Sequence, residues 1–377
     1  MSNHIVLLCR RYCPGEAWTN RILAYAKGFI ELGNNVTIFY LIPDRQRTHY
    51  EINLEGCSII NLWERNKGVF RIRPLAYLYN MFLFRRSLNE NDVIFNYGYD
   101  LYPLLFNKFF LRRWRFFSEL TESPLAYSPR FFKTLQVRLY NYLIKSVDGL
   151  FVISSSLKDY FIKQNFPSEK LHIINMFVDT NRFQGLKKND TRPYIAYCGT
   201  IALKKDAVDL LIESFKIFHK QYPSFYLYLI GNFGSERDKA VVGQLIRENE
   251  LQDSVVLTGP IEPTQMPQIL IDAKILALAR PRNLQTENGF PTKLGEYLAT
   301  GNPVVVSDVG EIAKYIHHNE NGYLVEVDNV IDFANQLIWI VNHYNEAQKV
   351  GLKGRQLSET EFSYLSQAEK ALKVMFQ

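Results

Sequence analysis

A glycine-rich stretch late in the chain holds the residues best suited to chemistry. It reads GFPTKLGEYLATGNPVVV, residues 289–306. The turn at 289–291 leads into a helix predicted to begin near Thr292, and the free backbone N–H groups there suit a phosphate or another anionic oxygen. An ordinary helix-to-strand unit with a surface lysine and glutamate would give the same pattern. The candidate binding residues of this stretch are Gly289, Phe290, Pro291, Thr292 and Lys293, with Glu296 three residues after Lys293.

Polar side chains also follow two predicted strands of the first half. Glu119 and Glu122, in SELTESP, come at the end of a strand predicted over 114–119, and Asn96 and Tyr97 end another predicted over 92–96. Parallel sheets place ligands at the carboxyl ends of their strands. Either glutamate could orient or deprotonate an acceptor hydroxyl. A helix N-cap in a solvated turn would use the same two residues.

No catalytic His, Ser or Cys arrangement and no metal-ligand spacing is evident among the 7 histidines and 4 cysteines. Cys9 and Cys13 are too far apart for a C-x-x-C pair. We therefore expect neither a metal nor a cofactor. Because the cysteines show no paired spacing, we also expect a reducing compartment such as the cytoplasm.

The elements that must position these residues are predicted as strands alternating with helices, a pattern typical of parallel sheets covered on both faces. A helix is indicated over 19–33, where apolar residues recur at helical spacing and Gly33 is a natural stop. Residues 178–193 are predicted to be a linker, and an amphipathic helix is expected from about Ser363. The strands are predicted over 4–9, 35–41, 57–62, 92–96, 114–119, 148–154, 193–198, 225–231, 254–259, 274–279, 303–308 and 322–327.

Composition and charge narrow the class of protein. A chain of 377 residues that is 47% hydrophobic and 22% charged fits two globular domains rather than a disordered chain. Residues 1–185 hold 24 Lys+Arg and 15 Asp+Glu, a balance of +9, whereas 186–377 hold 20 and 23, a balance of −3. In residues 1–185 the basic residues interleave with large apolar ones. This pattern suits an anionic membrane surface or an anionic ligand, and it equally suits core helices with solvated arginines. No stretch reaches 18 apolar residues, so a soluble or peripheral protein is expected.

Several segments resemble those of the retaining nucleotide-sugar glycosyltransferases of glycosyltransferase family 4, and they follow one another in the order found in that family. These enzymes have the GT-B fold. Residues 290–304 are similar to the donor-binding signature F-P-x-K-x-x-E-Y-x-A-x-G-x-P-V. LHIINMFVDTNRF resembles the passage into the second domain, YIAYCGTIALKKD and LYLIGNFG resemble the first loops of the donor domain, and SVVLTGPIEPTQMPQILIDAKI resembles the segment before the donor helix. The likeness covers most of the chain. It implies two facing Rossmann-like domains with a cleft between them: an acceptor-binding domain over 1–185, a donor-binding domain over 186–360, and a C-terminal helix over 361–377 that packs back toward the first domain.

The resemblance assigns roles to individual residues. Glu296 matches the glutamate that holds the nucleotide ribose hydroxyls. The family's first glutamate would fall at Asn288, whereas the glutamate present is Glu287, so either Asn288 replaces it or the loop shifts to bring Glu287 to the sugar. Gly15 and Glu16 match the loop that contacts the acceptor or the donor phosphate.

The same resemblance places cations at the donor diphosphate. Lys205, with Lys204 as a substitute, matches the lysine that neutralises charge developing on the leaving group. Gly199 is expected to allow close backbone approach to the phosphates. The family's frequent arginine after this glycine is Thr200 here, so one positive charge is missing unless Lys293 or Arg282 supplies it.

These features predict a retaining, metal-independent hexosyltransferase that moves a sugar from a nucleoside diphosphate donor, with UDP favoured, to a hydroxyl of a glycan or lipid-linked acceptor in cell-surface polysaccharide biosynthesis. A sugar-nucleotide epimerase on the same architecture and a catalytically silent subunit are the alternatives. The expected partners are the donor, the acceptor and an anionic membrane surface, with the protein in the cytoplasm and peripheral on the inner membrane face. Nucleic acid is not an expected partner, because the positive charge is interleaved with large apolar residues.

Overall fold

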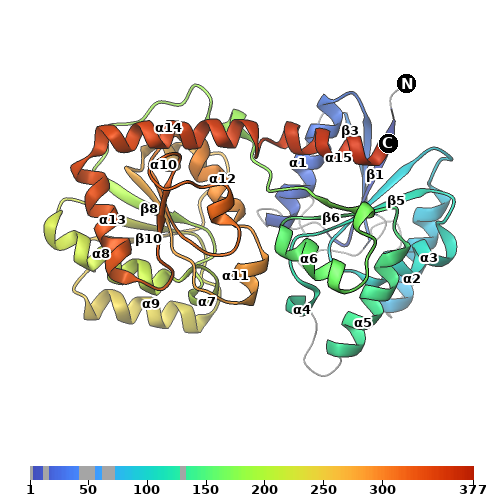
Figure 1. The fold of residues 1–377 in the computed structure, drawn as a ribbon, viewed down its shortest axis with the longest axis horizontal. Coiled ribbons are helices and arrows are strands. Elements are labelled where there is room, and N and C mark those ends of the chain that lie inside the picture. Colours follow the sequence, from blue (N-terminus) through green and yellow to red (C-terminus); the bar gives the residue numbers. More distant parts are fainter. Residues whose placement is uncertain (1–2, 12–16, 42–55, 62–72, 128–132) are drawn as a thin grey trace. The chain divides into compact units, whose positions relative to one another are not determined.

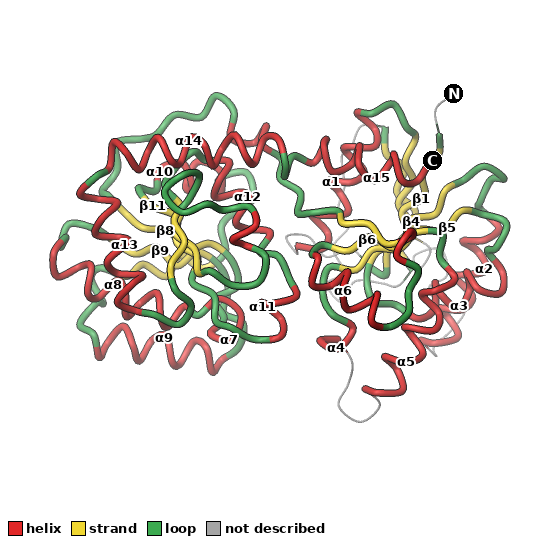
Figure 2. Tube along the Cα trace, viewed as in Figure 1, coloured by secondary structure: helices red, strands yellow, loops and turns green. Residues whose placement is uncertain are grey.

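The computed structural model describes residues 3–11, 17–41, 56–61, 73–127 and 133–377. The chain divides into two compact units, one of Met1–Phe177 with Tyr364–Gln377 and one of Val178–Ser363 (Figures 1 and 2). Each unit is a parallel sheet with helices on both faces, which confirms the predicted Rossmann-like fold class. None of the described helices is both long and apolar enough to cross a bilayer.

The first unit is built on one parallel sheet. Its described strands are β1 (His4–Cys9), β2 (Asn35–Tyr40), β3 (Cys57–Asn61), β4 (Val93–Tyr97), β5 (Arg115–Leu120), β6 (Gly149–Val152) and β7 (Leu171–Ile173). Among the described residues, these seven strands lie in the order β3-β2-β1-β4-β5-β6-β7. The side chains of β1 alternate between two hydrophobic clusters, with Ile5 and Leu7 in one and Val6 and Leu8 in the other. This period of two explains why an almost continuous apolar run forms a strand buried on both faces.

Helices cover both faces of that sheet. They are α1 (Ala17–Glu31), α2 (Arg73–Arg86), α3 (Leu101–Phe110), α4 (Pro124–Tyr127), α5 (Lys133–Leu143), α6 (Ser155–Lys163) and α15 (Tyr364–Phe376). Helices α1 and α15 pack on one face, and α2, α3, α5 and α6 pack on the other. Helix α15 lies against α1 through small residues, because a Cβ added at Gly28 would be 2.5 Å from the Ala368 Cβ.

The second unit, described in full, has its own parallel sheet. Its strands are β8 (Tyr194–Cys198), β9 (Tyr226–Ile230), β10 (Val255–Gly259), β11 (Ile275–Leu278), β12 (Val304–Ser307) and β13 (Tyr323–Val325). The order is β10-β9-β8-β11-β12-β13. The strand order therefore reverses between β8 and β11, and such a switch point leaves a crevice at the carboxyl ends of the two strands.

The helices of the second unit surround this sheet. They are α7 (Leu203–Asp206), α8 (Val208–Gln221), α9 (Glu236–Glu248), α10 (Met266–Asp272), α11 (Leu284–Asn288), α12 (Thr292–Ala299), α13 (Val330–Asn342) and α14 (Tyr344–Thr360). The segment predicted to be a linker belongs to this unit. The Asn189 backbone N–H donates to Asp272 Oδ1 at 2.8 Å, and Lys188 Nζ donates to the Ala273 carbonyl at 2.7 Å. These bonds fix the segment against α10, which explains the difference from the prediction.

Candidate functional site

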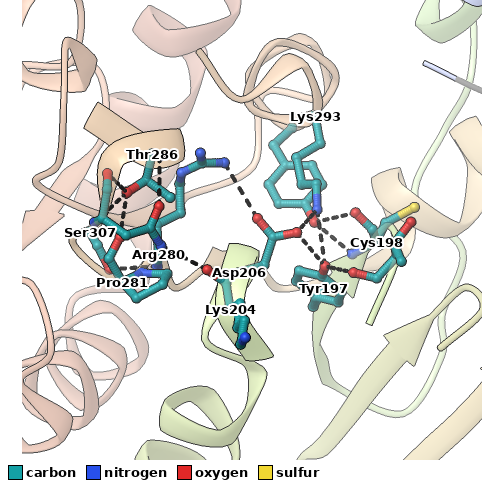
Figure 3. Close-up of polar contacts among 12 residues, drawn as sticks. Tyr197, Cys198, Lys204, Asp206, Arg280, Pro281, Thr286, Lys293 and Ser307 are labelled. Carbon is teal, nitrogen blue, oxygen red and sulfur yellow. Dashed lines mark hydrogen bonds and ion pairs between the residues drawn. The ribbon is translucent and has the colours of Figure 1, made fainter. Parts of the chain in front are cut away.

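A buried cluster of charged side chains lies at the switch point of the second unit (Figure 3). Asp206, the last residue of α7, is 1% exposed. Its Oδ2 accepts a hydrogen bond from Lys293 Nζ at 2.5 Å, and its Oδ1 lies 3.4 Å from Arg280 Nη1. The Tyr197 hydroxyl is 2.8 Å from the same Oδ2. One carboxylate thus faces two cations, which leaves this cluster with a net charge of +1.

Charge and burial act against each other in this cluster. Burial alone would raise the pKa of Asp206, but the charges of Lys293 and Arg280 outweigh it and hold that pKa below its usual range. Burial lowers the pKa of Lys293, although Asp206 opposes the effect. Nearby, burial and then the Glu296 carboxylate raise the pKa of the Cys198 thiol to about 12. Cys198 is therefore protonated at neutral pH and is not a thiolate nucleophile.

Local backbone features bring the cluster together. Ala207 has left-handed backbone angles, φ 38 and ψ 50, and separates the short α7 from α8, so Asp206 ends its own helix. On the other side, Asn283 caps α11 and donates through Nδ2 to the Lys204 carbonyl at 2.8 Å. The Thr286 hydroxyl donates to the Pro281 carbonyl at 2.6 Å. These bonds tie the chain leaving β11 to α7.

Two glycines make room beside the cluster. Gly199 follows β8 with φ +148, and a Cβ there would lie 2.4 Å from Lys293 Nζ. Gly231 follows β9 with φ +132, and a Cβ there would lie 2.1 Å from the Gly199 carbonyl oxygen. Both positions combine positive φ with close approach, so only glycine fits. The Lys293 ammonium consequently lies directly against the backbone of the β8 loop.

Helix α12 presents a second charged group on its partly exposed side. Glu296 Oε1 is 2.7 Å from Arg182 Nη1, with side chains 33% and 34% exposed. Arg182 Nη2 also donates to the Pro263 carbonyl at 2.8 Å. The buried Tyr297 hydroxyl accepts from the Cys198 backbone N–H at 2.6 Å and so fixes the helix to β8. Pro291, the N-cap of α12, supplies no side-chain acceptor, so backbone N–H groups of the first turn are suited to an anion.

The other predicted donor residues differ in their exposure and in their polar partners. Lys204, Lys205 and Thr200 are exposed on α7 and the loop before it. Glu287, half-buried on α11, pairs with Arg282 at 3.1 Å, and Asn288 donates through Nδ2 to the Leu284 carbonyl at 2.8 Å. Gly289 ends α11, and Thr292 begins α12.

Phe290 has a buried side chain. Its side chain is 6% exposed and packs against the rings of Tyr315 and Phe362, with centroids 5.4 and 5.8 Å away. The ring therefore belongs to the hydrophobic core that anchors the turn before α12, and the donor contact expected at Phe290 stays a prediction.

The predicted acceptor residues that the structure describes in the first unit differ in burial and in their partners. Glu119 is fully buried, and its carboxylate binds Arg21 at 2.5 and 3.1 Å and the Tyr25 hydroxyl at 2.8 Å. The interpretation of Glu119 as an acceptor base is therefore corrected to a buried ion pair. Arg21 also donates to the carbonyls of Ile174 and Asn175, at 2.9 and 2.8 Å. The pair thus supports the last segment of this unit before Val178.

The remaining acceptor candidates vary in position. Asn96 is buried and donates to the Ser118 hydroxyl at 3.1 Å, and the Tyr97 hydroxyl lies 3.5 Å from Thr121 Oγ1. Glu122 is half-buried in the turn after β5. Gly15 and Glu16 lie outside the described residues.

Sequence reasoning missed Asp206, Arg280 and Arg182. Arg280 lies two residues after the end of β11, so the rule that ligands meet strand carboxyl ends would have found it. Asp206 follows two lysines in the loop after β8, the same loop that supplied the predicted cations. Arg182 is 114 residues from Glu296 in sequence, and no spacing pattern joins them. Among the residues that the structure describes, no group of three or more His, Cys, Asp or Glu is placed to hold a metal.

Comparisons with known proteins identify relatives of this chain. Residues 178–357 match the family model described as glycosyl transferases group 1. The chain is 26% identical over 227 residues to the amylovoran biosynthesis glycosyltransferase AmsK of Erwinia amylovora, covering 59% of this chain and 55% of that protein. It is 27% identical over 230 residues to the poly(ribitol-phosphate) alpha-N-acetylglucosaminyltransferase of Staphylococcus aureus strain COL, covering 60% and 39%. The chain thus spans about half the length of the curated relatives it matches.

Solved structures match both units. A glycosyltransferase from Rickettsia africae ESF-5 superimposes with a TM-score of 0.79 at 16% identity, covering 100% of this chain and 98% of that one. Anabaena HepE in complex with UDP gives a TM-score of 0.76 at 16% identity, covering 99% of both chains. At this identity the likeness shows the fold, that of the GT-B glycosyltransferases. Residues 178–357 therefore match the glycosyl transferases group 1 family, and both units together have the fold of its solved relatives.

Proposed function

We propose that this protein is a retaining glycosyltransferase of family 4 that takes a sugar from a nucleoside diphosphate donor bound to Val178–Ser363. The observation that carries the proposal is the buried cluster of Asp206, Lys293 and Arg280, whose net positive charge lies beside Gly199 at the switch point of the sheet. A diphosphate leaving group gains negative charge as the glycosidic bond breaks, and preorganised cations in a water-poor site stabilise that charge strongly. The family match over 178–357 supports the same assignment.

Each element of the site then has a task. Lys293 and the first turn of α12 bind the diphosphate, and Lys205 or Lys204 adds a further positive charge from the exposed side of α7. Arg280 acts through Asp206, which holds Lys293 in place. Glu296 accepts hydrogen bonds from the ribose hydroxyls with the oxygen that Arg182 does not bind.

UDP is the favoured nucleotide. Anabaena HepE, a structural neighbour of the whole chain, was solved in complex with UDP. A curated relative is named for transfer of N-acetylglucosamine, and another for biosynthesis of amylovoran. We therefore propose a UDP-sugar donor and a glycan or lipid-linked acceptor in polysaccharide biosynthesis.

Transfer with retention fits a site without a dedicated base. Glu119 is engaged by Arg21 and Tyr25, so its carboxylate is not a base for an acceptor hydroxyl. We propose that the departing diphosphate takes the proton as the acceptor attacks from the same face, and that positioning dominates over base strength. Protein cations would carry the leaving-group charge in place of a metal, so EDTA should leave the transfer rate unchanged.

A screen of UDP-, GDP- and ADP-sugars tests the proposal by thermal shift and by donor hydrolysis, with Glu296→Ala measured alongside. We expect one UDP-sugar to stabilise the intact protein and to be hydrolysed slowly, with both effects lost in the variant. Binding without hydrolysis, even with acceptors added, would favour the catalytically silent subunit. Absence of binding by any of the three donor classes would contradict the proposal.

A further inference from the structure

Exposed apolar side chains are concentrated on three helices of the first unit. Of the 17 large hydrophobic residues exposed among the described residues, nine lie on α2, α3 and α5. Isolated exposed apolar residues are normal on any soluble protein, but a contiguous set marks an interaction surface. The nine are Leu75, Tyr79, Phe82, Leu105, Phe109, Phe110, Leu135, Leu139 and Tyr142.

These helices form one surface, which we call the three-helix face. Helices α2 and α3 touch through the rings of Phe82 and Phe110, with centroids 5.6 Å apart, and Arg85 Nε donates to the Phe110 carbonyl at 3.0 Å. Helices α3 and α5 meet where Lys108 Nζ lies 3.5 Å from the centroid of the Tyr142 ring. The three helices lie side by side in Figure 1. The apolar residues are therefore neighbours on one surface.

Basic residues predominate on the three-helix face, although the exposed acidic residues Glu90 and Asp148 follow α2 and α5. Arg85 and Arg86 lie at the end of α2, Lys108 lies in α3 and Arg138 in α5, and the sequences of the three helices contain no aspartate or glutamate. Exposed Arg112, Arg113 and Lys145 follow α3 and α5. A second copy of this chain is a poor occupant, because a symmetric contact would place like charges opposite each other.

A hollow on α2 is lined by both apolar and basic side chains. Its volume is about 300 Å³, and it is lined by Tyr79, Phe82, Leu83, Arg85 and Arg86. Two guanidinium groups suit a phosphate, and the aromatic and aliphatic walls suit the hydrocarbon next to it. A lipid headgroup at the boundary with its acyl chains presents this combination.

We propose that the three-helix face binds the surface of an anionic phospholipid bilayer. Exposed Phe, Leu and Tyr would enter the boundary between headgroups and acyl chains, and the surrounding Arg and Lys would pair with lipid phosphates. The proposal concerns where the protein binds and not what the second unit transfers. Vesicle binding is therefore measured without a donor, and it can fail while sugar transfer holds.

Co-sedimentation tests the proposal with vesicles of phosphatidylcholine containing about 30% phosphatidylglycerol, beside vesicles of phosphatidylcholine alone. We expect binding to the anionic vesicles that falls as NaCl rises from about 0.1 to about 0.5 M. Phe109→Ser combined with Leu135→Ser, at side chains 63% and 65% exposed, should weaken binding at least about tenfold without unfolding the protein. Ile331→Ser combined with Leu352→Ser, 57% and 56% exposed in the second unit, is the matched control and should bind like the wild type.

Three results would overturn the proposal. One is no sedimentation with anionic vesicles at the lower salt, and another is equal loss of binding in both double variants. The third is self-association, measured by analytical ultracentrifugation, that Phe109→Ser with Leu135→Ser abolishes, since this would assign the face to a second copy. Arg86→Glu with Arg113→Glu gives a separate test, because it should remove the preference for anionic lipid while leaving the apolar residues in place.

Discussion

Replacing Asp206 by asparagine tests whether the buried carboxylate organises the site. Asparagine keeps the shape and one acceptor oxygen, but it leaves Lys293 and Arg280 as two buried cations without a counter-charge. Removing one partner of a buried ion pair costs about 3–5 kcal/mol, and we expect about 3 because the Lys293 side chain is still 16% exposed. That loss corresponds to roughly a hundredfold in the equilibrium for opening of the second unit.

Hydrogen–deuterium exchange of the intact protein measures this loss in each unit separately, which a two-unit unfolding curve does not. Amide protection in β8 and β11 should fall by about two orders of magnitude, and protection in β1 and β4 should not change. Asp332→Asn is the control, because Asp332 accepts a backbone hydrogen bond from Glu326 at 2.7 Å and faces no buried cation. It should cost about 1 kcal/mol or less.

Affinity for UDP gives Asp206→Asn a second readout. The substitution raises the net charge of the cluster from +1 to +2, so charge alone would tighten UDP binding. If Asp206 acts by holding Lys293 in place, UDP binding should instead weaken about tenfold while uridine binding stays unchanged. Tighter UDP binding, or protection of β8 within twofold of the wild type, would refute the reasoning.

Three further predictions concern the second unit. Arg182→Ala and Arg355→Ala each break an ion pair that is about one-third exposed, and each should cost under about 1 kcal/mol of stability. Only Arg182→Ala should weaken UDP binding, measured by calorimetry. Equal UDP affinities of the two variants would contradict this prediction. Burial lowers the pKa of Lys188 from 10.5 to about 8, so the folded unit releases a proton that the unfolded chain keeps, and stability should rise between pH 8 and 10.5. Lys188→Met should remove that rise in Tm, and an identical pH dependence in both proteins would disprove the assignment. In Gly231→Ala the new Cβ would lie 2.1 Å from a backbone oxygen, so urea denaturation should show a loss of about 1–3 kcal/mol or more in the free energy of unfolding. Gly259→Ala is the control and should lose less, because φ is +68 there but the space around the residue is open.

The strands were predictable because each is a short apolar run between turn residues. All twelve predicted strands are present within a few residues, and Gly33 ends α1 with φ +83 as expected. β7 was missed, because Leu171–Ile173 has only three residues and a histidine at its centre. The break at Ala207 gives no sequence signal, since alanine usually continues a helix.

The candidate site was predicted in its location but only partly in its residues. The sequence proposed Lys293 and Glu296 as donor residues; in the structure Lys293 pairs with Asp206 and Glu296 with Arg182, and their contacts with a donor stay predictions. Glu119 was misread, because the strand-end rule does not say which face a side chain takes. Glu119 and Phe117 are two residues apart on β5, so their side chains lie on the same face of the sheet. Phe117 packs toward α1 on that face, and the Glu119 carboxylate therefore reaches Arg21.

Calorimetric titration with UDP tests the central claim most directly. We predict that the wild type binds UDP at least about tenfold more tightly than uridine, because Lys293 and the first turn of α12 bind the diphosphate. Glu296→Ala should weaken both ligands by a similar factor, because both carry the ribose. No UDP binding, or equal affinities for UDP and uridine in the wild type, would contradict the account.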